Sequence, residues 1–319
     1  MTCLYLTEED VTQLLTMPVA IASLDEAFRA LAEGKAQNIP RRRASGGSAL
    51  LHSMSAAAEY LGYAGWKQYV TRREGARFLF GMHQLATGKL VGLFEADRLG
   101  QQRTGAATGV ALKRLTPCQF ASLALFGAGW QAESQLEAAA AVLPHLNDVR
   151  VYARSAEKVE AFCKKMSARL QLSVRPAASS AAAARGADVI ITATSAKEPV
   201  FAASDADNVK FIAAMGSNWP QKAEIEPAVV AQAEIVVCDD VEACQLEAGD
   251  LIRAAQAQAF DWSQARRLCE FAKEPPPSEG RVLFKSVGLA LEDLAVGAAI
   301  LPMAERRGVG QSLDIQMGP

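Results

Sequence analysis

Three cationic segments near the start of the chain could bind an anion. Lys67 lies in an extended, mostly apolar run, "GYAGWKQYV", and Arg103 precedes the small-residue segment "TGAATG". A large cation is out of keeping with small neighbours, so we expect the guanidinium of Arg103 to point at an anion. Arg42 and Arg43 belong to a basic run, "PRRRAS". Each signal alone has a simpler explanation, because Lys67 could reach water from a strand edge and the basic run could be a solvated loop.

A glycine-rich turn is the second candidate site. In "SLALFGAGWQAESQLEAA" an apolar run stops at Gly127, and a helical pattern begins after Gly129. A strand, a tight turn and a helix in this order place a pyrophosphate at the helix N-terminus. Gly127 would allow the turn, Gly129 would let the backbone approach the phosphates, and Ala132 would keep helix and strand close. The glycine pattern is weak alone, and the following strand, about 20 to 25 residues later, strengthens the prediction of a bound dinucleotide.

The end of that following strand bears on the choice between NAD and NADP. An acidic residue there would bond the ribose 2′-OH and repel a 2′-phosphate. The strand "VRVYA" instead precedes Arg154 and Ser155, with Lys158 nearby. A guanidinium and a hydroxyl suit a 2′-phosphate. We therefore predict NADP(H) as the preferred cofactor and NAD(H) as the second option, although Arg154 could also be a solvated surface charge.

The composition argues against several classes of function. A net charge of -2 on 319 residues offers no general attraction to nucleic acid or to an anionic membrane surface. No apolar run reaches the roughly 18 residues of a membrane span, and the N-terminus lacks a signal core, so we expect a cytoplasmic protein. The six cysteines are scattered, which favours reduced thiols and no metal site. The three histidines pair with no plausible nucleophile, so a hydrolase mechanism has no support.

The elements that must position these residues change character along the chain. The first third predicts two helices, over "LTEEDVTQLL" and "VAIASLDEAFRALAEG", and then extended runs that end in a β-hairpin with its turn at residues 86–89. Residues 97–115 have helical spacing and many small residues, which permits close approach of another backbone. From Ala121 onward, apolar strands alternate with helices, one of them over "PAASSAAAARGAD". This alternation predicts an α/β domain with a doubly wound parallel sheet.

Two later segments complete this interpretation. The predicted strand "VKFIAA" ends near Gly216, and ligands of open parallel sheets bind in the loops past the carboxyl ends of the strands. Ser217 and Asn218 are therefore placed to touch a substrate. The apolar helical pattern in "FKSVGLALEDLAVGAAILPMAERRG" predicts a return to the first domain.

Taken together, seven segments resemble the ornithine cyclodeaminase and mu-crystallin family. They are "HSM…GWKQYV", "QQRTGAATGVA", "FGAGWQAESQ", "YARSAEK", "MGSNWPQKAEI", "VVCDDVEACQLEAGDL" and "LFKSVGLALEDLA". The resemblance implies a homodimer with an α+β substrate-binding and dimerisation domain, residues 1–115 and 293–319. It also implies an inserted NAD(P)-binding Rossmann domain, residues 116–292.

The resemblance assigns roles to individual residues. The family binds the carboxylate of an α-amino or α-imino acid with an arginine after a proline, a strand lysine and the arginine of "RTGA". These correspond to Arg42 or Arg43, Lys67 and Arg103. The cofactor-binding residues that we expect are Thr104, Gly127, Ala128, Gly129, Trp130, Gln131, Arg154, Ser155, Lys158, Thr192, Ala193, Thr194, Met215, Ser217 and Ser286.

Asn218 departs from the cyclodeaminase members of the family. Those members carry an aspartate in a "GxDxPGK" loop, where it can deprotonate the substrate's second amine, whereas asparagine cannot take that proton. The loop "GSNWPQK" is more similar to members that reduce a preformed cyclic ketimine, such as 1-pyrroline-2-carboxylate or 1-piperideine-2-carboxylate. We therefore expect an NADPH-dependent ketimine reductase that forms L-proline or L-pipecolate. Lys67, or a water held by Asn218, would protonate the imine nitrogen.

Three other functions remain open. Ornithine cyclodeaminase would need catalytic NAD, and both Asn218 and Arg154 argue against it. Alanine dehydrogenase would differ mainly in its acyclic substrate. A non-catalytic NADPH-dependent ligand-binding protein could keep the same pocket, although the retention of Lys67 and Arg103 weighs against pure binding.

Overall fold

The computed structural model describes residues 3–72, 74–273 and 280–315, and the chain forms two compact units. Unit 1 comprises residues 1–103 and 289–319, and unit 2 comprises residues 104–288. The first boundary lies inside helix α3 (Asp97–Leu115), whereas the sequence places it at the end of that segment. The domain bounds expected from the sequence, 1–115 with 293–319 and 116–292, therefore stay a prediction.

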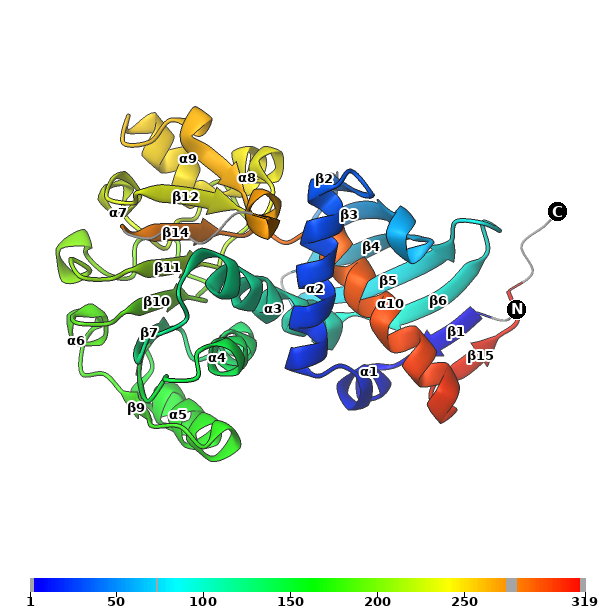
Figure 1. Ribbon diagram of the computed structural model, residues 1–319, viewed down its shortest axis with the longest axis horizontal. Helices are drawn as coiled ribbons and strands as arrows, with labels where there is room; N and C mark the ends of the chain where they lie inside the picture. Colours follow the sequence, from blue (N-terminus) through cyan, green and yellow to red (C-terminus); the bar gives the residue numbers. More distant parts are fainter. Residues whose placement is uncertain (1–2, 73, 274–279, 316–319) are drawn as a thin grey trace. The chain divides into compact units, whose positions relative to one another are not determined.

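Unit 1 contains a mostly antiparallel sheet in the order β15-β1-β6-β5-β4-β3-β2 (Figure 1). β1 runs parallel to β6, and the other neighbouring pairs are antiparallel. Helices α2 and α10 pack against each other, and α10 also packs on β3 and β4. The elements are β1 (Cys3–Leu6), α1 (Glu8–Leu14), α2 (Met17–Ala32), β2 (Ala36–Gly46), β3 (Ala49–Ala58), β4 (Tyr63–Arg72), β5 (Gly75–Gln84), β6 (Leu90–Glu95), α10 (Ala290–Arg307) and β15 (Gln311–Leu313).

Local signals explain several of these elements. Thr7 caps α1 in a capping box, because its side chain accepts a hydrogen bond from the Asp10 N–H while the Asp10 carboxylate accepts from the Thr7 N–H. Gly34, just beyond α2, and Gly88, in the turn between β5 and β6, both have positive φ. The two helices and the β-hairpin predicted from the sequence are confirmed.

Unit 2 contains a parallel sheet in the order β13-β12-β14-β11-β10-β7-β8-β9, in which every neighbouring pair is parallel. The order reverses between β7 and β10, as in a doubly wound Rossmann sheet, which confirms the predicted fold class. The strands are β7 (Ser122–Phe126), β8 (Asp148–Tyr152), β9 (Val174–Pro176), β10 (Val189–Thr192), β11 (Phe211–Ala214), β12 (Ile235–Cys238), β13 (Ala265–Arg267) and β14 (Val282–Lys285). The helices are α4 (Trp130–Val142), α5 (Ala156–Leu170), α6 (Ser180–Ala184), α7 (Pro227–Ala231), α8 (Val241–Glu247) and α9 (Gly249–Gln256).

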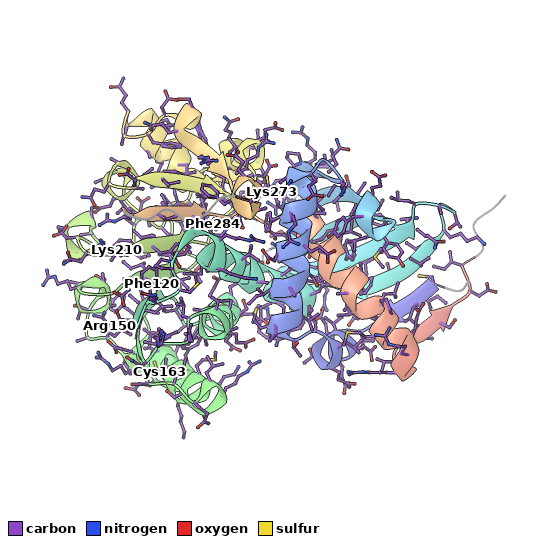
Figure 2. The ribbon with its side chains drawn as sticks, viewed as in Figure 1. Phe120, Arg150, Cys163, Lys210, Lys273 and Phe284 are labelled. Atoms are coloured by element: carbon purple, nitrogen blue, oxygen red, sulfur yellow. The ribbon has the colours of Figure 1, made fainter. Side chains whose placement is uncertain are left out.

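The sequence analysis missed three strands of this sheet, the three-residue β9 and β13 and the buried β14, and overestimated one helix. β14 lies between β11 and β12, and its Phe284, labelled in Figure 2, is fully buried. Its four residues run directly into the apolar stretch that leads to α10, so no period distinguishes them. The predicted Ala-rich helix is only the five residues of α6. Within the described residues, no helix combines the length and the apolar character that crossing a membrane requires.

Candidate functional site

Lys67 of β4 is buried in an ion pair. Its ammonium donates a hydrogen bond of 2.7 Å to Asp293 Oδ1, and its side chain is only 2% exposed. The alternative of a strand-edge lysine with its ammonium in water is therefore wrong. Burial lowers the pKa of Lys67 to about 8, although Asp293 raises it, and the positive charges of Arg103 and Arg41 lower it further.

Arg103 belongs to the same cluster of charges. Its Nη1 donates a hydrogen bond of 2.7 Å to Glu292 Oε2, and its Nε lies 3.5 Å from Asp293 Oδ1. Lys67 and Arg103 therefore converge on one carboxylate oxygen. Both carboxylates lie in the first turn of α10, where the helix dipole stabilises negative charge.

A β-bulge decides which arginine of the basic run lies near Lys67. Ile39 pairs with Ser55 and Arg42 pairs with Ser53, so two residues of β2 stand opposite a single residue of β3. One of these two residues is Arg41, which is buried and acts electrostatically on Lys67. We refer to Arg41, Lys67, Arg103, Glu292 and Asp293 as the charge cluster.

The two arginines named from the sequence have other surroundings. Arg42 is exposed, and Arg43 donates a hydrogen bond of 3.2 Å from its Nε to Nδ1 of His52. Burial lowers the pKa of His52 to about 4, and Arg43 and Arg41 lower it too, so this histidine is neutral and can accept that bond. The assignment of Arg42 or Arg43 to the substrate carboxylate stays a prediction. The burial of Arg41 favours Arg41 for that role.

Sequence reasoning missed Arg41, Glu292 and Asp293. The two carboxylates were visible in the segment "LFKSVGLALEDLA", but an acidic pair at the start of a helix is usually a solvated helix cap. The feature that could have revealed them as buried is that both lie in an otherwise apolar helical pattern. Arg41 was hidden because simple alternation along a strand carries no sign of a bulge.

Gly100 of α3 leaves room for the Lys67 ammonium. A Cβ at this position would lie 2.8 Å from Lys67 Nζ, closer than real contacts allow. The clash would involve the far end of a flexible side chain, so the lysine can move away at little cost in stability.

The glycine-rich turn in unit 2 has the geometry expected for a phosphate cradle. Gly127 has a φ of 114°, and a Cβ there would lie 2.4 Å from the carbonyl oxygen of Ala193. Gly129 caps α4, and a Cβ on it would meet no atom of the described residues within 4 Å. The fold itself therefore requires glycine at Gly127, whereas open space in front of Gly129 suits the close approach of a ligand.

A buried glutamate joins two of the predicted cofactor loops. Glu224 accepts hydrogen bonds from the hydroxyls of Thr192 and Thr194 and from the backbone N–H groups of Thr194 and Gly216, all within 2.7–2.8 Å. Burial raises the pKa of Glu224, and the neighbouring Asp250 raises it further. This side chain ties the loop after β10 to the loop after β11.

Further buried charges hold the remaining loops at the carboxyl edge of the sheet. Lys285 donates to the Ser217 carbonyl at 2.8 Å and lies 2.8 Å from the Asp250 carboxylate. Asp239 accepts a hydrogen bond from the Ser286 hydroxyl at 2.7 Å and two more from the backbone N–H groups of Val287 and Gly288. Sequence analysis missed these anchors, because each joins segments that lie far apart in the chain.

The other predicted cofactor residues lie as follows. Ser155 caps α5, and Arg154 and Lys158 are exposed beside it at the end of β8. Thr104 offers its carbonyl oxygen to Gln135, and Ser134 donates to the carbonyl of Gln131. Trp130 is exposed, Asn218 is partly buried, and Ala193 and Met215 are buried, while Ala128 belongs to the glycine-rich turn. In the described part of the chain, no group of three or more His, Cys, Asp or Glu is placed to hold a metal.

Comparison with known proteins identifies the family. The model of the ornithine cyclodeaminase/mu-crystallin family matches residues 2–306, and the chain belongs to this family. It is 30% identical to alanine dehydrogenase of Archaeoglobus fulgidus over 98% of both chains. It is 33% identical to Delta(1)-pyrroline-2-carboxylate reductase of Bacillus cereus, over 72% of this chain and 71% of that protein.

A solved structure agrees with this assignment. Delta(1)-pyrroline-2-carboxylate reductase of Thermococcus litoralis, in complex with NADH and L-proline, superposes with a TM-score of 0.91 at 26% identity. The match covers 97% of this chain and 100% of that one. Fold and relatives together identify an NAD(P)H-dependent oxidoreductase.

The substitution Gly100→Ala tests the position of Lys67. We expect it to lower the rate of imine reduction by about 100-fold, because a misplacement of about 1 Å can cost that much. The free energy of unfolding should change by less than about 1 kcal/mol, because alanine favours the helix and the lysine can move. Gly46→Ala is the control, since a Cβ at Gly46 meets nothing within 4 Å. Full activity of Gly100→Ala would show that the ammonium is not needed at this position.

Proposed function

We propose that this protein reduces a small cyclic imino acid with NADPH. The substrate would be 1-pyrroline-2-carboxylate or 1-piperideine-2-carboxylate, and the product L-proline or L-pipecolate. The observation that carries this proposal is the convergence of Lys67 and Arg103 on Asp293 in a buried cluster that also includes Arg41. Membership of a family with pyrroline-2-carboxylate reductases supports it.

The balance of charge in the cluster suits a ligand with one carboxylate. Its three cations and two carboxylates are all buried. Asp97 also acts on Lys67, but Asp97 is exposed and water screens its charge. The buried members therefore carry one positive charge in excess, and a bound carboxylate would neutralise it. Arg41 and Arg103 would hold the planar carboxylate through paired N–H groups.

The chemistry also needs a proton donor. A nicotinamide cofactor, which the open turn at Gly129 can accommodate, would supply a hydride to the imine carbon. The nitrogen then needs a proton, and Lys67, with a pKa of about 8, is suited to donate one near neutral pH. A water held by Asn218 is the alternative donor. Asn218 itself cannot act as a base, which disfavours deamination of a diamine.

The first experiment measures turnover by the wild-type protein. We expect NADPH absorbance to fall when 1-pyrroline-2-carboxylate or 1-piperideine-2-carboxylate is added, and no ammonia to be released from ornithine with NAD. Turnover of neither imine would contradict the proposal.

The second candidate function is alanine dehydrogenase. The relative from Archaeoglobus fulgidus aligns over almost the whole chain, and an acyclic amino acid carries the same carboxylate. NADH oxidation with pyruvate and ammonium, in the absence of cyclic imine reduction, would favour this function. If neither the cyclic imines nor pyruvate with ammonium is turned over, an NADPH-dependent ligand-binding protein is favoured.

The paired substitutions Arg41→Met and Arg42→Met test which arginine binds the carboxylate. Loss of a charge-assisted hydrogen bond costs about 1.5 to 3 kcal/mol, so Arg41→Met should lower kcat/KM by roughly 10- to 100-fold. Arg42→Met should stay within about 2-fold of the wild type, because Arg42 is exposed on the sheet. Steady-state kinetics with the cyclic imine would reveal the difference. The reverse ranking would restore the assignment made from the sequence.

The preference for NADPH is proposed on the charges at the end of β8. Arg154 and Lys158 are exposed there, and Ser155 keeps its hydroxyl at the start of α5. Arg154→Asp should lower kcat/KM for NADPH by roughly 10- to 100-fold and leave that for NADH within a few-fold, because the new carboxylate repels only a 2′-phosphate. An equal loss with both cofactors would argue that Arg154 does not contact the 2′-phosphate.

The homodimer is proposed on the exposed face of the unit 1 sheet. Leu51 and Val70 are directly opposite each other on β3 and β4, and both are exposed, as is Ile39 on β2. Helices cover the other face of this sheet. Exposed apolar side chains on an uncovered sheet face suit a second copy of the chain.

Val70→Glu should therefore convert the dimer to a monomer, as measured by light scattering after gel filtration, because a carboxylate would be buried without a partner. Leu246→Glu is the control, since Leu246 is also exposed (49%, against 37% for Val70) but belongs to α8 of unit 2. A monomeric wild type, or a dimeric Val70→Glu, would contradict the proposed interface.

A further inference from the structure

The buried pair of Lys67 and Asp293 needs an explanation beyond stability. Asp293 is fully buried, and it lies 226 residues from Lys67 in the chain. Removing two charges from water is costly, and apolar residues of similar volume often stabilise a core as well or better. A purely structural contact between β4 and α10 would not require this pair.

The second oxygen of Asp293 points to the same conclusion. Asp293 Oδ2 is buried and accepts no hydrogen bond from any residue in the described ranges. Buried polar atoms usually have a hydrogen-bond partner, so this oxygen calls for an explanation, and a role in the chemistry of the cluster is one. The hydrogen-bonding capacity of Asp293 is instead directed through Oδ1 to the Lys67 ammonium.

The two adjacent carboxylates of α10 have different contacts, because Asp293 pairs with both Lys67 and Arg103, whereas Glu292 pairs with Arg103. Glu292 Oε2 bonds Arg103 and also accepts a hydrogen bond from the Leu289 N–H, so it caps the helix. Asn38 Oδ1 accepts from the Leu291 N–H and links the helix start to β2. The first turn of α10 is therefore held in place, and Asp293 faces Lys67 from a rigid support.

We propose that Asp293 is a positioning residue that keeps Lys67 protonated and aimed, so that Lys67 is the proton donor to the imine nitrogen. This inference rests on the proposed function. In the step, a hydride with its electron pair forms a C–H bond at the imine carbon, and the C=N π bond breaks. The nitrogen takes a proton from the Lys67 ammonium, and the neutral lysine regains one from water. Asp293 stays ionised throughout.

The charges around Lys67 decide the direction in which loss of Asp293 shifts the pKa of this lysine. From α10, Asp293 favours the ammonium, while Arg103 from α3 and Arg41 from β2 disfavour it, and burial does so most strongly. Asp97 at the start of α3 also favours the ammonium, from an exposed position. Without Asp293, the opposing effects remain, so the pKa of Lys67 would fall below about 8 and the lysine would lose its proton at a lower pH than in the wild type.

The test compares Asp293→Asn with Glu292→Gln across a range of pH. In Asp293→Asn the alkaline limb of kcat should move down by about 1 to 3 pH units, because an opposite charge at this distance shifts a pKa by that amount. Its activity should recover as the pH is lowered, whereas a merely structural defect would not be rescued by acid. Glu292→Gln should raise KM for the imino acid through Arg103 and leave the limb in place. Asp293→Glu, which keeps the charge, should retain a limb near that of the wild type.

A second measurement does not depend on turnover. The titration of Lys67 can be followed by NMR of protein labelled at lysine Cε with carbon-13, with the resonance assigned by its loss in Lys67→Met. The midpoint should fall in Asp293→Asn and stay within about half a unit in Glu292→Gln. The inference is overturned if the titration midpoint of Lys67 is unchanged in Asp293→Asn. It is also overturned if this variant loses activity at every pH while the alkaline limb of its kcat profile stays in place. Absent turnover by the wild type contradicts the proposed function instead, and the NMR midpoints still decide the role of Asp293.

Discussion

The buried ion pair between Lys67 and Asp293 is the constraint on which the charge cluster of unit 1 depends. It joins β4 to α10, two elements from opposite ends of the chain, at a distance of 2.7 Å. An unpaired charge is costly in a low-dielectric interior, so burial of Lys67 requires that β4 and α10 pack together. Arg103 pairs with Glu292 of the same helix and is thereby held beside them. The same contact thus affects both where the cations lie and how easily the lysine loses its proton.

Unit 2 uses buried carboxylates for a similar purpose. Glu224 gathers backbone and hydroxyl donors from two loops, and Asp239 gathers donors from the loop after β14. Loops at the carboxyl edge of a parallel sheet have no ladder of their own, so their N–H groups need acceptors from elsewhere. Fixed loops are what a dinucleotide site requires, since an ordered backbone binds phosphates without a further entropic cost.

The two units therefore divide the chemistry in a consistent way. Unit 1 supplies a compact group of side-chain charges suited to a small carboxylate, and unit 2 supplies backbone groups and a glycine-rich turn suited to a nucleotide. Helix α3 passes from one unit to the other directly after Arg103. Its Gly100 makes room for the Lys67 ammonium, and a Cβ on its Gly105 would lie 2.3 Å from the Ser134 carbonyl oxygen, so small residues serve both units.

The sequence by itself determined what local geometry controls. Gly127 marked the strand, turn and helix of the predicted nucleotide site, Thr7 marked a helix start, and Lys67 and Arg103 stood out as cations among unsuitable neighbours. Only the tertiary structure shows that Arg41 is buried and Arg42 exposed, because a bulge in β2 changes which side chains face inward. It alone also revealed Glu224 and Asp293, which bond Thr194 and Lys67, respectively 30 and 226 residues away. Turns and caps are decided by neighbouring residues, whereas the partner of a buried charge is decided by how distant segments pack.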